Sequence, residues 1–310
     1  MRLAKILILL VLCLAGAQIC PASETGSWKM PAFIAKDVLQ TLKDDEQELD
    51  GYCLRLAYPQ IAAIEKQPDG SQWLLMADGR QVPFVLSGAG DWQMDDNMPV
   101  AHTMAELYNL EPERPDLAPG QAPGRKRSRF LLEALYGNNA SEVMKGLVST
   151  KFRGRKIALS RPAGQALAAA IPELEALLAE KPHLAPWLVP EGGFYWRKIA
   201  GENRLSPHSY GIAVDFGVKI APYWRWARIN PHPKQKSYPG EIVRIMEDNG
   251  FIWGGKWHEY DLMHFEYRPE LVCKARIKAM LGGISSSFPP ESPESLGKGR
   301  KHPLENAPGK

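Results

Sequence analysis

The sequence predicts an α+β protein in which helices and short strands are mixed. Residues 52–86 consist of short runs rich in β-forming residues, separated by two Asp-Gly turn dipeptides. Residues 163–179 are rich in Ala and Leu, which predicts a helix. Alternating apolar residues at 212–215 predict a strand. These three observations together place the chain in the α+β class.

The composition excludes several protein classes. Of the 310 residues, 45% are hydrophobic and 24% are charged, which is typical of globular proteins. There is no sustained heptad and no recurring block, so we expect neither a coiled coil nor a repeat protein. The formal charge is +3, of which Arg2 and Lys5 supply two positive charges in a segment expected to be removed. This balance predicts no nucleic-acid partner.

Residues 1–22 predict a cleavable signal peptide. Arg2 and Lys5 precede an unbroken apolar run that ends at Ala17, and small and polar residues follow. The run is about a dozen residues long, short of the ~20 that a bilayer-spanning helix needs, so we expect no stable membrane span in the mature chain. Cleavage after Ala17 or Ala22 would give a periplasmic or secreted protein.

Residues 23–124 are expected to hold an N-terminal helix, a strand-rich region and a linker. The helical pattern is weak and extends to about residue 50, and residues 112–123 are dense in Pro, Gly and charge, which predicts a linker or an extended arm. The basic residues at 124–129 are expected to form a solvated surface. Strands are predicted at residues 61–64, 73–76 and 82–86.

Residues 125–284 are expected to form the main domain, and residues 285–310, which have almost nothing to bury, a disordered tail. Pro172 should kink or restart the helix at 163–179, and Gly250 should end another helix. The predicted helices cover residues 128–135, 163–179 and 241–249.

Cys53 and Cys273 leave two alternatives open. An oxidising compartment permits a disulfide between them. The sequence cannot place their Cα atoms within the ~7 Å that a disulfide requires, so two separate buried thiols fit equally well. Neither cysteine has the CxxC spacing of a metal or redox site.

The first candidate site motif is L-S-P-H-S-Y-G-I-A-V-D-F at 205–216, which places His208 seven residues before Asp215. In the predicted strand, Asp215 lies at the end and His208 in the lead-in, while Gly211 allows close backbone approach. The two side chains could converge on one ion. Taken alone, however, such a pair also fits surface or capping residues.

The second motif, at 250–270, holds Asp261 three residues before His264. A strand at 262–267 would place His264 and Glu266 on one face, with Asp261 in the turn before it. Two histidines and one carboxylate with an open position are typical of catalytic zinc. A further carboxylate could take the proton of the attacking water. His258 is a rival ligand at a less regular position, and Glu266 could be either an acceptor behind the ligands or an ion-pair partner.

Three motifs in this order resemble those of the zinc D-alanyl-D-alanine carboxypeptidases and L-alanyl-D-glutamate endopeptidases, the VanY-like and endolysin-like peptidases that share a metal-site core with the hedgehog domain. They are S-x-H-x-x-G-x-A-x-D from Ser206, W-G-G-x-W from Trp253 and D-x-x-H-F-E from Asp261. The resemblance spans about residues 125–270. It implies an antiparallel sheet that holds Zn²⁺ and is flanked by helices.

By this resemblance, His208, Asp215 and His264 are the zinc ligands and Asp261 is the general base. Some relatives carry Glu at the base position, and the shorter Asp requires the water to lie closer. Arg197 matches the place where the family keeps an arginine near the zinc, where it would bind a substrate carboxylate or the carbonyl oxygen. Arg204 is close in sequence and could take this role, and Arg197 could instead be merely exposed.

The resemblance implies a zinc-dependent peptidase that hydrolyses a bond in the peptidoglycan stem peptide. Carboxypeptidase and endopeptidase activities both remain open. The alternative is a non-catalytic cell-wall peptide-binding protein that retains the fold, although such a protein has no reason to keep ligands, base and arginine together. A Ser-His-Asp hydrolase is disfavoured because the chain lacks a G-x-S-x-G motif. Trp224, Trp226, Trp253 and Trp257 could line a groove or lie in the core.

Overall fold

The computed structural model describes residues 28–31, 34–88, 96–111 and 117–287, and for 283–287 it describes the backbone only. The predicted signal segment lies outside these residues. In the described part, helices combine with three antiparallel sheets, which agrees with the predicted α+β class. No helix in it is long and apolar enough to cross a bilayer.

The helices and strands differ widely in length. The α-helices are α1 (Lys36–Asp44), α2 (Glu46–Ala57), α3 (Val100–Thr103), α4 (Arg129–Tyr136), α5 (Ala140–Lys145), α6 (Arg161–Glu180), α7 (Trp224–Ala227), α8 (Pro233–Lys236), α9 (Gly240–Asp248) and α10 (Pro269–Ser287). The 3₁₀ helices are η1 (Pro182–Leu188), η2 (Pro207–Tyr210) and η3 (Gly254–Lys256). The strands are β1 (Ile61–Lys66), β2 (Gln72–Met76), β3 (Gln81–Val85), β4 (Leu147–Phe152), β5 (Arg155–Ser160), β6 (Pro190–Gly192), β7 (Ala213–Phe216), β8 (Phe251–Trp253) and β9 (His264–Tyr267).

The N-terminal strands form the antiparallel meander β1-β2-β3, close to the predicted positions. Gly70 and Gly79 sit in its two turns with φ of +85° and +87°, a conformation that favours glycine. The helical segment before the meander was predicted to end near residue 50, which is wrong. Asp45 interrupts it by capping a second helix, α2, with its carboxylate, and α2 continues to Ala57.

The remaining predicted helices are present, with corrected boundaries. α6 is one continuous helix that runs through Pro172, so the expected restart does not occur. α9 ends just before Gly250, which has φ of +84°. α10 reaches Ser287, so the first three residues of the predicted tail are helical, and the rest of that tail lies outside the described residues.

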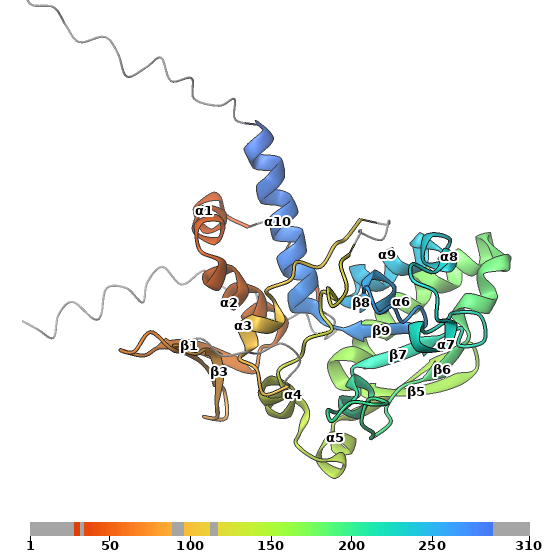
Figure 1. Ribbon diagram of the computed structural model, residues 1–310, viewed down its shortest axis with the longest axis horizontal. Coiled ribbons are helices and arrows are strands. Elements are labelled where there is room, and N and C mark those ends of the chain that lie inside the picture. Colours follow the sequence, from red (N-terminus) through yellow and green to blue (C-terminus); the bar gives the residue numbers. More distant parts are fainter. Residues whose placement is uncertain (1–27, 32–33, 89–95, 112–116, 288–310) are drawn as a thin grey trace, which may run out of the picture.

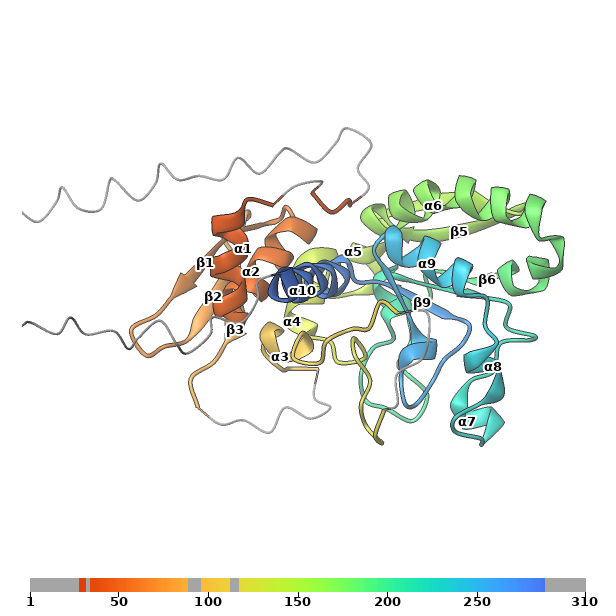
Figure 2. The ribbon, with the colours of Figure 1, turned by 90° about the horizontal axis from the view of Figure 1, so that it is seen from above.

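α10 joins the N-terminal helices to the rest of the protein. In Figures 1 and 2 it lies between the meander with α1 and α2 on one side and the larger group of helices and strands on the other. Cys53 of α2 and Cys273 of α10 form a disulfide, with a Cα–Cα distance of 5.6 Å. Buried Lys274 adds an ion pair with Asp50 at 2.6 Å. The structure thus resolves the cysteine alternatives in favour of the disulfide.

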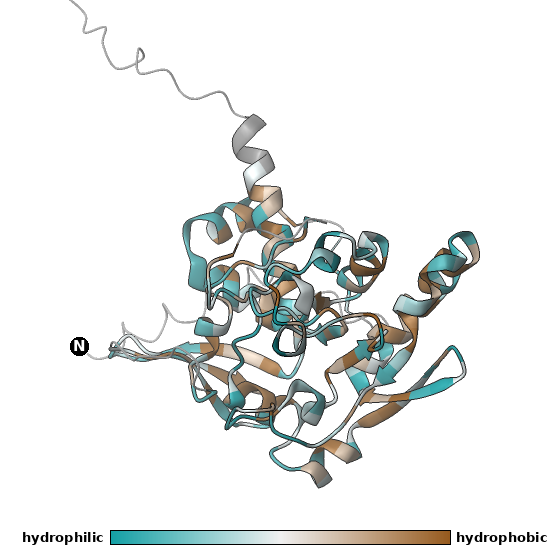
Figure 3. Ribbon diagram, turned by 45° about the vertical axis from the view of Figure 1, so that its right-hand side comes forward, coloured by the Kyte–Doolittle hydropathy of each residue, from teal (hydrophilic) through white to brown (hydrophobic). Residues whose placement is uncertain are grey.

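The site is built on a four-stranded antiparallel sheet in the order β6-β7-β9-β8. Hydrophobic residues such as Val214, Phe216 and Phe265 are fully buried on it. In Figure 3, hydrophobic colour concentrates on the interior strands and hydrophilic colour on peripheral loops and helix faces. Polar groups on the central strands are therefore exceptions in a close-packed core, and they mark the candidate site.

Candidate metal centre

A tight turn connects His208 on the 3₁₀ helix η2 to Asp215 on β7, an interior strand of the sheet. Ser206 caps the 3₁₀ helix η2, which carries His208. Gly211 ends it with φ of +65°, and a Cβ here would lie 2.7 Å from the backbone nitrogen of Ser160. Only glycine fits this contact. The chain then enters β7, where Asp215 occupies a position that is only partly buried.

His264 meets these residues through strand pairing. Asp215 of β7 lies directly opposite His264 of β9. Asp215 Oδ1 is 3.1 Å from His264 Nδ1, and Asp215 Oδ2 is 3.3 Å from His208 Nε2. One ligand atom from each of the three residues lies within 4.8 Å of the others. The structure therefore brings together the three predicted ligands, in an arrangement that could hold a metal ion.

The outer nitrogen of each imidazole has an acceptor. His208 Nδ1 lies 2.7 Å from the carbonyl oxygen of Gly193, and because that oxygen can only accept, Nδ1 must donate. His264 Nε2 lies 3.5 Å from Glu266 Oε2. The other two nitrogens, His208 Nε2 and His264 Nδ1, face Asp215 and are the atoms that could bind a metal ion.

Within this group, neighbouring charges shift the pKa values of Asp215 and His264 in the direction opposite to the shift caused by burial. Burial alone would raise the pKa of Asp215, but the two histidines hold it well below its usual range. Burial alone would lower the pKa of His264, but Asp215 and Glu266 raise it to about 10. The group thus combines two buried histidines with a partly buried carboxylate whose negative charge favours a cation.

Asp261 lies in the turn before β9, beside the ligands and outside their close group. Its backbone carbonyl accepts a hydrogen bond from the His264 amide at 3.2 Å. Its Oδ1 is buried and has no hydrogen-bond partner among the described residues. Burial raises the pKa of Asp261 to about 6, while the charge of His264 lowers it and that of Asp215 raises it. A buried acceptor without a partner suits a group that takes a proton from a ligand or water.

A glycine allows the Asp261 turn to pack closely. The Asp261 amide donates to the Gly254 carbonyl at 3.0 Å. A Cβ on Gly254 would lie 2.6 Å from the Asp261 carbonyl oxygen, so a larger residue would displace the turn. This contact explains one glycine of the W-G-G-x-W motif.

The basic run at 124–129 is not a solvated surface, and this prediction was wrong. Arg127 is buried and donates to both carboxylate oxygens of Glu266, at 2.7 and 2.5 Å. Arg268 lies 3.5 Å from the same carboxylate. Burial would raise the pKa of Glu266, but Arg127 and Arg268 hold it well below its usual range. Glu266 is therefore both an ion-pair partner and an acceptor for His264, the two roles left open by the sequence.

The linker that precedes the basic run is an ordered arm where it is described. The Pro123 carbonyl accepts a hydrogen bond from Trp257 Nε1 at 2.8 Å, and the Gln121 carbonyl accepts one from the His258 amide at 3.0 Å. The arm therefore packs on the loop that leads to Asp261. Its role could not be found from sequence because both contacts use backbone carbonyls, which every residue has.

Arg197 and Arg204 have different surroundings. Arg204 is buried, and its guanidinium binds Glu202 at 2.6 Å and the Arg125 carbonyl at 3.1 Å. Arg197 is exposed and lines the same cleft as His208 and Asp215. Of the two arginines, Arg197 is the one placed to meet a ligand at the metal site.

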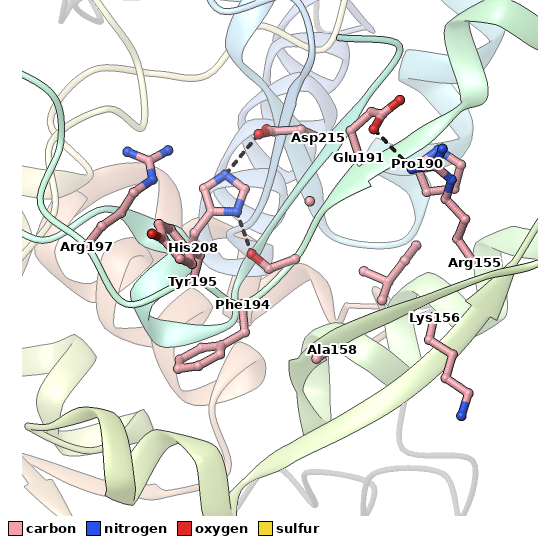
Figure 4. Close-up of a pocket in the computed structure, with 13 residues that line it drawn as sticks. Arg155, Lys156, Ala158, Pro190, Glu191, Phe194, Tyr195, Arg197, His208 and Asp215 are labelled. Carbon is pink, nitrogen blue, oxygen red and sulfur yellow. Dashed lines mark hydrogen bonds and ion pairs between the residues drawn. The ribbon is translucent and has the colours of Figure 1, made fainter.

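The cleft beside the ligands has a volume of about 500 Å³. Figure 4 shows His208 at its centre, Arg197 on one side, and the strand carrying Arg155 on the other. Its walls come from β5, β6 and the loop after β6. The sheet edge thus offers room for an extended peptide next to the ligands.

The remaining candidates lie apart from the ligand group. His258 is 3.0 Å from Glu259 and does not join the three ligands. Trp253 and Trp257 are buried in the core, and Trp224 is half-buried, which favours the core interpretation for these three. Trp226 is 70% exposed, so the core interpretation is wrong for this residue.

The comparison with protein families agrees with this site. Residues 200–267 match a family model described as D-alanyl-D-alanine carboxypeptidase. The matched span contains His208, Asp215, Asp261 and His264, while Arg197 lies just before it. Comparison with curated proteins and with solved structures gives no match. The segment that builds most of the candidate metal centre is thus similar to the D-alanyl-D-alanine carboxypeptidase family.

Proposed function

We propose that this protein is a zinc-dependent peptidase that hydrolyses a peptide bond in the peptidoglycan stem. One observation carries the proposal: His208, Asp215 and His264 come together, the first two of them line a cleft, and a buried oxygen of Asp261 near them has no partner among the described residues. The family match over the same residues supports a peptidase. The proposal extends this match to a metal, a substrate and residue roles.

The residues fit zinc better than a hard cation. Two imidazoles and one carboxylate are a common ligand set for catalytic Zn²⁺, whereas Ca²⁺ and Mg²⁺ prefer oxygen ligands. The acceptors on the outer imidazole nitrogens, Gly193 O and Glu266, would orient both rings. Zinc bound here would supply Lewis acidity and would lower the pKa of water at a position open to the cleft.

Asp261 would act as the general base. Its Oδ1, which has no hydrogen-bond partner among the described residues, can accept the proton of the attacking water. The carboxyl group can then donate that proton to the leaving amine. Burial keeps bulk water from competing for the carboxylate. Arg197, on the cleft wall, would bind a substrate carboxylate or the carbonyl oxygen that gains negative charge during attack.

The location proposed for the mature chain is the periplasm or the outside of the cell. The proposal rests on the basic residues and short apolar run of residues 1–22. The Cys53–Cys273 disulfide also suits an oxidising compartment. N-terminal sequencing of the mature protein should begin near Gln18 or Ser23. A start at Met1 in a cytoplasmic fraction would contradict the proposal.

The function is tested by digesting purified muropeptides with the zinc-loaded protein and determining the masses of the products by mass spectrometry. We expect loss of a terminal D-alanine or cleavage between L-alanine and D-glutamate, and we expect a chelator to abolish either reaction. Intact muropeptides after prolonged incubation with the zinc-loaded, folded protein would contradict an enzyme. Saturable peptide binding without cleavage would favour the non-catalytic alternative.

A further inference from the structure

An ion pair between two strands forms part of the cleft wall and has no role in the proposed chemistry. Arg155 of β5 and Glu191 of β6 both line the cleft, and Arg155 Nη1 lies 3.1 Å from Glu191 Oε2. Figure 4 shows the pair on the far side of His208 from Arg197. The side chains are 57% and 25% exposed, so a bound ligand could reach both charges.

The pair lies close to the metal ligands along the strand. Glu191 directly precedes Gly192, where a Cβ would lie 3.6 Å from Asp215 Oδ2 and 3.8 Å from His208 Cε1. Because an extended chain advances about 3.3 Å per residue, the pair lies about one or two residues of bound peptide from the reacting bond. A side chain of the substrate at that distance would meet Arg155 and Glu191.

The chemistry of the pair defines what it would accept. A partly exposed ion pair contributes little to stability, so its two members can exchange partners at little cost. A ligand with one charge would satisfy either Arg155 or Glu191 and leave the other group without its partner. A side chain that ends in both an ammonium and a carboxylate would satisfy both groups at once.

We propose that Arg155 and Glu191 form a subsite for a zwitterionic side chain of the stem peptide, with the carboxylate bound by Arg155 and the ammonium by Glu191. This inference rests on the proposed function, because it assumes a stem peptide in the cleft. Such a side chain is that of meso-diaminopimelate, whereas lysine at the same position has only the ammonium. The subsite would therefore recognise the side-chain carboxylate that meso-diaminopimelate has and that lysine lacks.

The test uses two synthetic stem pentapeptides that differ only in meso-diaminopimelate or L-lysine at the third position. We expect the wild-type kcat/KM to favour the diaminopimelate peptide by about tenfold or more, because a charge-assisted contact is worth about a factor of ten or more. Arg155→Gln should reduce this preference to less than about threefold. Glu191→Gln should lower kcat/KM for both peptides by similar factors, because both peptides carry the side-chain ammonium.

A neighbouring cation gives a matched control. Lys156 follows Arg155 on β5, and its side chain points away from the pair in Figure 4. Lys156→Gln should therefore keep the wild-type preference. Equal loss of preference in Lys156→Gln and Arg155→Gln would show a general charge effect and overturn the subsite.

The outcomes separate the subsite from the function. Equal hydrolysis of both peptides by the wild-type protein would overturn the subsite and leave the proposed function intact. Hydrolysis of neither peptide would overturn the function. Calorimetric binding of the same peptides to the zinc-loaded protein then still tests the subsite, since equal affinities would overturn it. Circular dichroism and zinc content would check that each variant is folded.

Discussion

Arg127 and Glu266 form a bidentate ion pair, with N–O distances of 2.7 and 2.5 Å, next to His264, one of the three proposed metal ligands. Glu266 is completely buried and lies two residues after His264 on β9. The guanidinium fork satisfies both carboxylate oxygens, and one of these oxygens also faces the imidazole. The pair therefore connects the segment before α4 to the side chain that contacts His264, a proposed metal ligand.

Breaking this pair should destabilise the protein. Arg127→Met would leave the Glu266 carboxylate buried with less compensation, and we expect a loss of about 3 to 5 kcal/mol in unfolding free energy. Urea denaturation measures the loss. Lys66→Met is a control, since Lys66 is 62% exposed and pairs with Glu48, and it should cost less than about 1 kcal/mol. Equal costs for the two variants would contradict the assigned importance of the buried pair.

The Cys53–Cys273 disulfide should contribute measurably to stability. It closes a loop with a sequence separation of 220 residues, and such a cross-link restricts the unfolded chain. Cys53→Ser together with Cys273→Ser should lower the unfolding free energy by about 2 to 5 kcal/mol, and a reductant should do the same to the wild-type protein. Identical denaturation curves with and without reductant would show that the cross-link has no such effect.

Removing a metal ligand should remove the metal. His208→Ala and His264→Ala should each lose stoichiometric zinc, because two ligands bind it far less tightly than three. Metal analysis of dialysed, folded protein measures this. His258→Ala should retain about one zinc per chain, because His258 contacts Glu259 and lies outside the ligand group. Full zinc content in both ligand variants would refute the assignment.

The Arg197 side chain should affect the turnover of the substrate and not the binding of the metal. Arg197→Ala removes a charge-assisted contact, so kcat/KM for a stem peptide should fall about 10- to 100-fold while zinc stays bound. Steady-state kinetics measures the fall. Lys198→Ala is the matched control, since its exposed Nζ contacts Asn203, and it should change kcat/KM less than about threefold. An unchanged Arg197→Ala enzyme would leave that side chain without a role in the reaction.

Local patterns predicted the elements that hold the site. The His208–Asp215 spacing and the alternation around His264 depend on strand geometry, and strand pairing places Asp215 opposite His264. The Asp-Gly turns of the N-terminal meander follow from glycine's access to positive φ. Such features involve residues close in sequence.

Contacts between distant residues were not predictable in the same way. The basic run containing Arg127 resembles a solvated surface in sequence, because its partner Glu266 is 139 residues away. The end of α2 was missed for a different reason, because Leu54, Arg55, Leu56 and Ala57 are good helix formers that the prediction assigned to the β-rich segment. Of the two errors, the one at Arg127 is the case in which a tertiary contact overrides the local signal.

The most direct test of the account is the zinc content and peptide turnover of Asp261→Asn. If Asp261 is the general base and not a ligand, the variant should keep about one zinc per chain while hydrolysis of a stem peptide falls at least about a hundredfold. Asp248→Asn, at an exposed residue that pairs with Arg276, should keep both properties. An Asp261→Asn protein with full activity would contradict the mechanism, and a zinc-free one would make Asp261 a metal ligand.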